Sequence, residues 1–158
     1  MFEGLVSFIY YLVDAWGYFG VFLASLIASG TFFFPIPSHL FVFIFSKTLN
    51  PFLIALVASL GASLGEFTGY ALGVGSRLVV EKKYGNKIKK WEKKAEKYGT
   101  FWILVLFAAT PLPDDVPGVF AGMMHYNRKK FFLAVFIGKI MMYLAIAYSG
   151  KFFLNWIL

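Results

Sequence analysis

Two ionisable side chains lie inside long apolar runs of the sequence. Residues 51–76 contain a single charge, Glu66, and residues 131–149 contain a single charge, Lys139. A charged group inside a bilayer costs about 3 kcal/mol or more, so it is expected to be paired, protonated or hydrated. We expect Glu66 and Lys139 to pair near the membrane midplane and to contribute to a substrate or ion path. The alternative is a structural salt bridge that joins two helices.

Polar residues also follow two Pro-x-Pro motifs. Ser38 and His39 come directly after the first motif, and Asp114 and Asp115 come directly after the second. Ser and Asp are good helix N-caps, because their oxygens accept N–H groups that the first turn leaves free. We therefore expect Ser38 and one aspartate to cap helices. The other aspartate is a candidate proton or cation site. His39 is a candidate for titration near physiological pH or for contact with an anionic headgroup.

Signatures of enzyme chemistry are missing from the sequence. There is no cysteine, which excludes thiolate nucleophiles, thiolate metal ligands and disulfides. Neither His39 nor His125 belongs to an H-E-x-x-H motif, and the sequence predicts no strand-to-helix turn of the nucleophile-elbow type. The sequence therefore predicts no enzyme, no cofactor and no metal site.

The overall composition is that of a membrane protein. Hydrophobic residues make up 59% of the chain and charged residues 15%, whereas a soluble domain has about 25% charged residues. Residues 1–8 lack the basic region and the cleavage site of a signal peptide, so we expect the first segment to stay in the mature protein. The sequence predicts a single integral membrane domain over residues 1–158.

The net charge of +7 is concentrated in one segment. Nine of the 15 Lys and Arg residues lie between Arg77 and Lys97, against three Glu residues. Next to apolar runs, such a segment is typical of a loop on the cytoplasmic face that touches anionic headgroups. We predict a basic cytoplasmic segment over residues 77–98, with Arg77 as an interfacial anchor or headgroup contact. Motifs that stack on bases or read a groove are missing, so no nucleic-acid partner is predicted.

The apolar runs differ in length. Residues 51–76 and 131–149 each reach about the 20 residues that a spanning helix needs. Residues 100–110 cover only about 16 Å as a helix before Pro111 and Pro113 must break it. Both flanks of this segment are basic, which predicts a re-entrant hairpin on one membrane face. Irregular backbone at that depth is buried in protein or lines a wet cavity, so the hairpin tip is a candidate site.

The first half of the chain repeats the plan of the second half. Residues 16–19 and 98–101 both have the pattern aromatic-Gly-x-Phe, and each opens an apolar arm that ends at a Pro-x-Pro break. The first Pro-x-Pro break contains Pro35 and Pro37. The apolar run that follows it contains the pattern Gly-charge-x-x-x-Tyr, which ends at Tyr70. An odd number of crossings in each unit makes such repeats inverted, as in many transporters. The predicted fold is an all-α inverted repeat of two re-entrant Pro-x-Pro hairpins, each followed by a transmembrane helix.

The predicted units are an N-terminal helix, a first repeat, the basic segment and a second repeat. They cover residues 1–15, 16–76, 77–98 and 99–150. Residues 2–14 either lie in the interface as an amphipathic helix or join residues 15–28 in a further span. Residues 151–158 are too short to cross and are expected to anchor at an interface.

Four motifs of the sequence resemble one known family. They are PIPSHLFVF at residues 35–43, GASLGEFTGYALGVGSR at 61–77, TPLPDDVPGVFAGMM at 110–124 and FIGK at 136–139. In this order they are similar to the DedA superfamily, also called the SNARE-associated Golgi protein or VTT domain, over roughly residues 17–150. The resemblance implies two opposed re-entrant hairpins. It also implies lipid partners, because bacterial members are implicated in recycling polyprenyl-phosphate carriers and eukaryotic relatives in phospholipid scrambling.

The family motifs fall on small and charged residues of this chain. By position they match Gly61, Gly65, Glu66, Tyr70, Gly73, Ala121, Gly122, Gly138 and Lys139. This sequence has His39 where many bacterial members carry an acid, and Ala108 and Asp114 where they carry two arginines. Acidic and basic positions of those bacterial members are thus partly exchanged in this sequence, which is typical of a divergent subgroup.

The leading functional prediction is a flippase or scramblase for a lipid or polyprenyl phosphate. The hairpin tips would hold the headgroup, because free N–H groups at helix N-termini favour anions. The alternatives are a proton- or ion-coupled transporter of small solutes and a structural membrane module. The predicted path consists of Glu66, Lys139, Asp114, Asp115, His39 and Tyr70, and the predicted tips of Pro35, Pro37, Ser38, Pro111 and Pro113. A stripe of small residues between Gly61 and Gly69 predicts close helix packing within one protomer or in a homo-oligomer.

Overall fold

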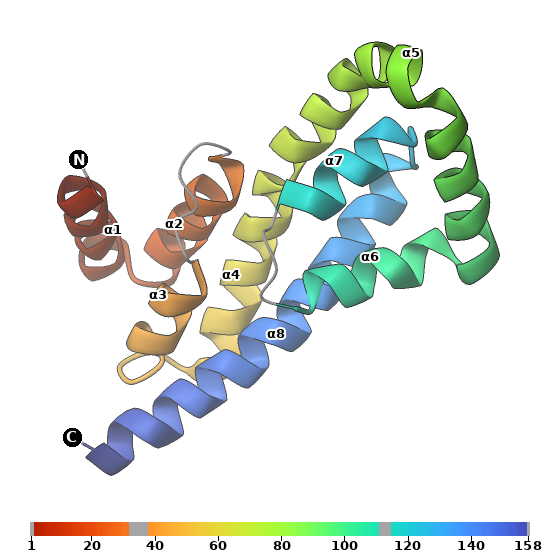
Figure 1. Cartoon of the computed structure of the whole chain (residues 1–158). Helices are drawn as coiled ribbons and strands as arrows, with labels where there is room; N and C mark the ends of the chain where they lie inside the picture. Colours follow the sequence, from red (N-terminus) through yellow and green to blue (C-terminus); the bar gives the residue numbers. More distant parts are fainter. Residues whose placement is uncertain (1, 32–37, 111–114, 158) are drawn as a thin grey trace.

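The computed structural model describes residues 2–31, 38–110 and 115–157, and every element in these ranges is a helix (Figure 1). The helices are α1 (Phe2–Trp16), α2 (Tyr18–Gly30), α3 (Ser38–Phe45), α4 (Pro51–Gly65), α5 (Phe67–Tyr98), α6 (Thr100–Ala108), α7 (Asp115–Met123) and α8 (Arg128–Ile157). The predicted all-α class is confirmed. Outside the described residues lie Pro35, Pro37, Pro111, Pro113 and Asp114, which belong to the predicted hairpin tips and path.

Two helices are long and apolar enough to cross a membrane. α4 continues into α5 through Glu66, which keeps a helical backbone, and the combined helix contains a stretch with a mean hydropathy of 1.5. The second is α8, with a mean hydropathy of 2.0. Both predicted spans are thus helical. α8 runs on to Ile157, so the C-terminal residues prolong this helix and do not form a separate segment.

Both long helices begin after an asparagine. The Oδ1 atom of Asn50 accepts hydrogen bonds of 3.0 and 3.4 Å from the second and third backbone N–H groups after it. The Oδ1 atom of Asn127 does the same at 3.0 and 3.1 Å. These caps satisfy donors that the first helical turn leaves free, and Pro51 follows Asn50 at a position where an N–H is not needed. The two helix starts are therefore determined locally.

The basic segment is helical, so the prediction of a loop there was wrong. α5 bends at Tyr84, where the backbone leaves the helical region (φ −130°, ψ 18°). The bend turns residues 85–98, the basic half of α5, back toward α6 and α7 (Figure 1). Ile88 and Ala95, two turns apart on one face, are buried there, while most of the lysines are exposed. An amphipathic helix therefore accommodates the charge run.

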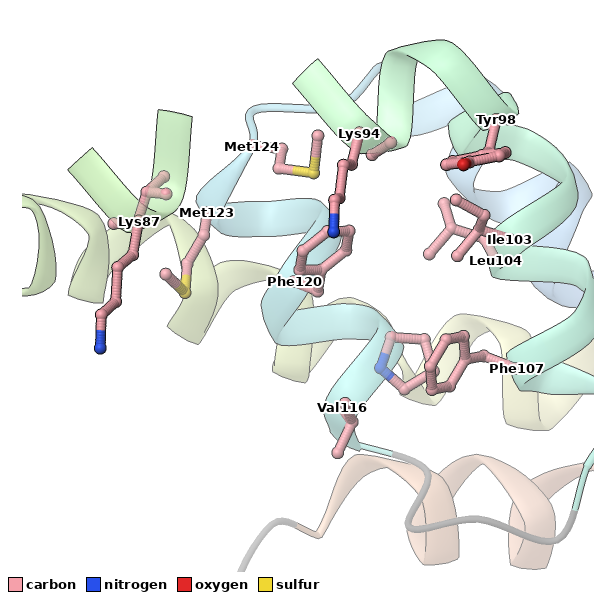
Figure 2. A pocket seen from close by; sticks show the side chains of 13 residues that line it. Lys87, Lys94, Tyr98, Ile103, Leu104, Phe107, Val116, Phe120, Met123 and Met124 are labelled. Carbon is pink, nitrogen blue, oxygen red and sulfur yellow. The ribbon is translucent and has the colours of Figure 1, made fainter. Parts of the chain in front are cut away.

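The basic half of α5, α6 and α7 enclose a cavity of about 620 Å³ (Figure 2). α7 lies between α5 and α6 and packs on the straight part of α5. Tyr98, the last residue of α5, and Met123, the last residue of α7, both line the cavity.

The aromatic-Gly-x-Phe motif opens a helix in each half of the chain. Gly17 and Gly99 both have a positive φ, 55° and 79°, which glycine adopts without the steric cost that other residues meet. α2 and α6 begin directly after these glycines. The turn at Gly17 folds α1 against α2, so residues 2–28 form two packed helices instead of one continuous span.

In each half of the chain, one short helix packs on the first long helix and another packs on the second. α2 packs on α4 and α3 packs on α8, whereas α6 packs on α8 and α7 packs on α5 (Figure 1). α4 also packs directly on α8. The two long helices therefore form a central pair that the short helices flank.

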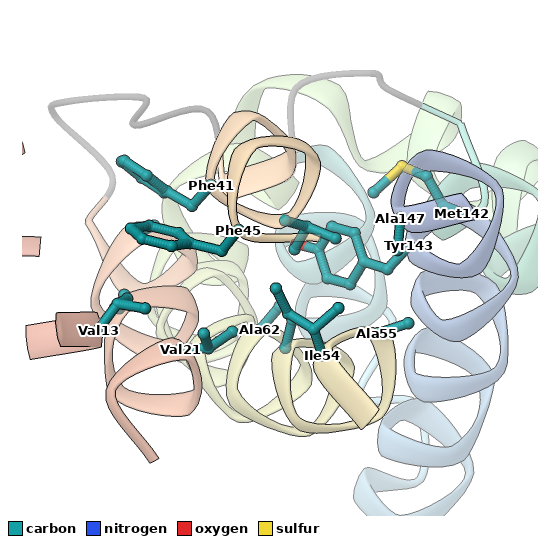
Figure 3. Close-up of a cluster of buried hydrophobic side chains, with 14 residues drawn as sticks. Val13, Val21, Phe41, Phe45, Ile54, Ala55, Ala62, Met142, Tyr143 and Ala147 are labelled. Carbon is teal, nitrogen blue, oxygen red and sulfur yellow. The ribbon is translucent and has the colours of Figure 1, made fainter. Parts of the chain in front are cut away.

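The buried apolar side chains form two clusters. One lies among α1 to α4 and α8 and includes Phe41, Ile54 and Tyr143 (Figure 3). The other lies among α5, α6, α7 and α8 and includes Tyr70 and Phe131. Because lipid tails are as apolar as these side chains, such clusters stabilise a membrane protein through close packing rather than through exclusion of water.

Candidate functional site

A buried ion pair joins the two long helices. The Nζ atom of Lys139 lies 3.3 Å from Oε1 of Glu66, and each side chain is only 2% exposed. Glu66 lies where α4 passes into α5, and Lys139 lies on α8. Either charge alone would be costly in such a place, so each compensates the other. The predicted pairing is confirmed, whereas its part in a substrate or ion path stays a prediction.

A glycine precedes each member of the pair and admits a neighbouring helix. A Cβ atom on Gly65 would lie 2.6 Å from the backbone oxygen of Leu26 in α2. A Cβ atom on Gly138 would lie 2.5 Å from the backbone oxygen of Val105 in α6. Side chains do not tolerate such contacts with backbone, so α2 and α6 reach the ion pair only because these residues are glycines. The small-residue stripe at Gly65 therefore packs within one protomer.

A tyrosine lies one helical turn after each charge. Tyr143, which is fully buried, shares a hydrogen bond of 2.7 Å with the hydroxyl group of Ser38 at the start of α3. The hydroxyl group of Tyr70 donates a hydrogen bond of 2.6 Å to the backbone oxygen of Tyr126, beyond α7. The two tyrosines thus connect α3 to α8 and the segment after α7 to α5. Sequence reasoning selected Tyr70 and Ser38 but predicted neither bond.

The structure describes the other predicted path residues to different extents. His39 is half-buried on α3, and its ring makes no hydrogen bond or ion pair with the residues that the structure describes. Asp115 is the first residue of α7. Asp114 and the four prolines lie outside the described residues, so the predicted hairpin tips stay predictions.

Arg77 connects three parts of the second half. Its Nη1 atom donates a hydrogen bond of 2.6 Å to the backbone oxygen of Met123 and lies 3.0 Å from Nδ1 of His125. The guanidinium group also pairs with Glu92 at 3.4 Å and with Glu81 at 3.5 Å. Since Glu92 follows the bend in α5, its ion pair holds the basic half of α5 near the carboxyl end of α7. The predicted headgroup contact of Arg77 stays a prediction.

The cavity under the basic half of α5 was not predicted from the sequence. Neither Glu66 nor Lys139 lines it. Its walls come from three helices whose residues are brought together only by the bend in α5. The local signals were weak: a buried stripe at Ile88 and Ala95, and the adjacent residues Met123 and Met124 at the end of α7.

Comparisons with known proteins agree with the motifs. The family model of the VTT domain matches residues 36–152. Transmembrane protein 41B of Xenopus tropicalis and of Xenopus laevis is 33% identical over 113 residues, which are 66% of this chain and 40% of the frog protein. The uncharacterized protein MJ0201 of Methanocaldococcus jannaschii is 26% identical over 137 residues, 85% of this chain and 84% of that protein. This chain thus spans about 40% of the length of the frog relatives. No solved structure gave a significant match.

Proposed function

We propose that this chain, which belongs to the VTT domain family, is a transporter that moves a lipid or polyprenyl phosphate across the bilayer. It is an integral membrane protein with two helices long enough to cross. The observation that carries the proposal is the buried ion pair between Glu66 and Lys139. Charged residues inside membrane segments commonly mark substrate or ion pathways.

In this proposal, α2 with α3 and α6 with α7 are two re-entrant hairpins related by an inverted repeat. Three parallels support it. Each unit opens at a glycine with positive φ, each following long helix has an asparagine cap, and each unit packs its two helices on different long helices. In transporters built this way, half-helix N-termini near the midplane face anionic groups. The residues at the proposed tips are therefore suited to a phosphate.

The basic half of α5 lies on the cytoplasmic face in this proposal. Lysines concentrate on that face in membrane proteins, and nine of the 15 Lys and Arg residues lie between Arg77 and Lys97.

The chemistry proposed for the ion pair is an exchange of partners. A phosphate that reaches Lys139 can replace Glu66 as the counter-ion of the ammonium group. No lysine charge is then left unpaired in the apolar interior, and Glu66 is compensated by a proton or by water that enters with the headgroup. The hydrocarbon tail remains in the surrounding lipid.

The complete burial of the pair favours a second candidate, a structural role. Two side chains that are each 2% exposed can fix the register of two helices without touching a substrate. In that case the chain is a structural module of the membrane, and loss of the pair lowers stability alone.

Purified protein in liposomes tests the proposed function. Headgroup-labelled polyprenyl phosphate and phospholipid probes are placed in both leaflets, and their access to an external quencher is followed with and without a pH gradient. Transport without a gradient supports passive scrambling, and transport only with a gradient supports coupled movement. No lipid movement in either condition, together with a proton flux, would replace the lipid proposal by an ion-coupled one.

A further inference from the structure

An apolar cavity lies between the basic half of α5 and the helices α6 and α7. Its volume of about 620 Å³ lies within the range of roughly 300–1,000 Å³ that small-molecule sites occupy. Ile103 and Phe107 come from α6, and Val116 and Phe120 come from α7 (Figure 2). Almost all of this wall is hydrocarbon, so the cavity suits an apolar chain and not a polar solute.

Two lysines border this apolar cavity. In Figure 2 the side chain of Lys94 points into the space beside Phe120, whereas Lys87 points away from it. Within the part of the chain that the structure describes, no carboxylate lies within ion-pair distance of either lysine. The Lys87 ammonium instead lies 5.7 Å from the centre of the Tyr84 ring. The cavity therefore combines an apolar interior with Lys94 at its border, an exposed lysine without an ion pair among the described residues.

We propose that this cavity binds a hydrocarbon chain of an anionic phospholipid, with the phosphate held by Lys94. Lysine side chains place their methylene groups along apolar surface and their ammonium group at the interface, which is where a lipid phosphate lies. Each lysine near an anionic membrane surface contributes about 1 kcal/mol of attraction. A zwitterionic lipid such as phosphatidylcholine would fill the same walls, but its choline cation offsets the phosphate charge, so Lys94 should attract it less than a lipid with a net negative charge.

The site goes beyond the proposed function, because it holds a resident lipid away from the ion pair of Glu66 and Lys139. The Arg77–Glu92 ion pair, at 3.4 Å, holds the basic half of α5 over the cavity. A lipid chain between α6 and α7 would thus be covered by a helix that is already fastened to the end of α7. A bound lipid is therefore expected to reduce the mobility of the carboxyl end of α7.

Photolabelling in nanodiscs tests the site. The probe is a phosphatidylglycerol with a diazirine near the end of one acyl chain, and the comparison lipid is phosphatidylcholine with the same chains. We expect the anionic probe to label peptides that contain Phe107 and Phe120 preferentially. Lys94→Gln should lower this labelling about fivefold, the equivalent of about 1 kcal/mol. Lys93→Gln, which changes the same charge at an exposed residue outside the cavity wall, should not.

A second pair of variants separates the cavity from ordinary contact with lipid. Ile103→Trp should fill the cavity and remove the labelling, whereas Leu106→Trp, at a residue that is 67% exposed on α6, should leave it unchanged. Equal labelling by both lipids, or labelling that is insensitive to Lys94→Gln and Ile103→Trp, would overturn the proposal. Because binding is measured at equilibrium, it is independent of transport. A chain that transports lipid without cavity labelling contradicts only this site, and the reverse contradicts only the proposed function.

Discussion

The ammonium group of Lys139 lies 3.3 Å from the carboxylate of Glu66, and both side chains are 2% exposed. This contact connects the two long helices beside Gly65 and Gly138, where α2 and α6 pack closely against them. A relative movement of the long helices must either carry both charges along or separate them. The contact therefore couples the two halves of the chain mechanically, whether its role is transport or structure.

Glu66→Gln should destabilise the protein, because it leaves the ammonium group of Lys139 buried opposite an amide. Removal of one partner from a buried pair typically costs about 3–5 kcal/mol. The double variant Glu66→Gln with Lys139→Met removes both charges and should recover most of this loss. Thermal unfolding in detergent, followed by tryptophan fluorescence, measures both. A double variant that is no more stable than the single one would contradict the mutual compensation of the charges.

Gly138→Ala should destabilise the packing of α6 on α8. The added Cβ atom would lie 2.5 Å from the Val105 oxygen and 2.6 Å from Cβ of Ala108. Overpacking of this kind costs about 1–3 kcal/mol. Gly75→Ala is the matched control, since a Cβ there meets no atom within 4 Å and alanine favours a helix by about 0.5–1 kcal/mol. The two substitutions should therefore shift the unfolding temperature in opposite directions, and a shared direction would argue against close packing at Gly138.

The hydrogen bond between Ser38 and Tyr143, at 2.7 Å, should appear as an energetic coupling between α3 and α8. In a double-mutant cycle with Ser38→Ala and Tyr143→Phe, we expect a coupling free energy of about 1 kcal/mol. Tyr148→Phe serves as the control, because this tyrosine is 56% exposed on the same helix. Strictly additive effects of the two substitutions would mean that the bond does not contribute to stability.

Arg77→Gln should release the basic half of α5. The substitution removes the ion pair with Glu92 and the charged hydrogen bond to the Met123 oxygen, each of a type worth about 1 kcal/mol or more when partly buried. We expect amide hydrogen exchange in residues 85–98 to become about tenfold faster. Glu81→Gln removes only an exposed pair on the same helix and should have little effect. Unchanged exchange in Arg77→Gln would show that other contacts hold this segment.

Features that depend on local composition were predictable. Apolar length identified the two long helices, and the repeated Gly-charge-x-x-x-Tyr motif led to the pairing of Glu66 with Lys139. The aromatic-Gly-x-Phe motif located the starts of α2 and α6, because glycine is the residue that accepts a positive φ there.

Features that depend on the bend in α5 were not predictable. The charge run next to apolar segments predicted a loop, whereas its few apolar residues, Ile88 and Ala95, form a buried stripe once the segment is helical. The contact of Arg77 with Glu92 and the walls of the cavity exist only after the chain turns at Tyr84. Gly85, which follows the bend, is a local sequence signal for it. A single glycine within a helical pattern does not specify in which direction the helix bends.

The most direct test of the central claim is lipid movement in liposomes by the double variant Glu66→Gln with Lys139→Met, compared with the unaltered chain at equal thermal stability. The transport account predicts that the unaltered chain exposes labelled polyprenyl phosphate or phospholipid to an external quencher and that the folded double variant does not. Equal movement by both proteins, or movement by neither, would contradict the claim that the buried pair serves lipid transport.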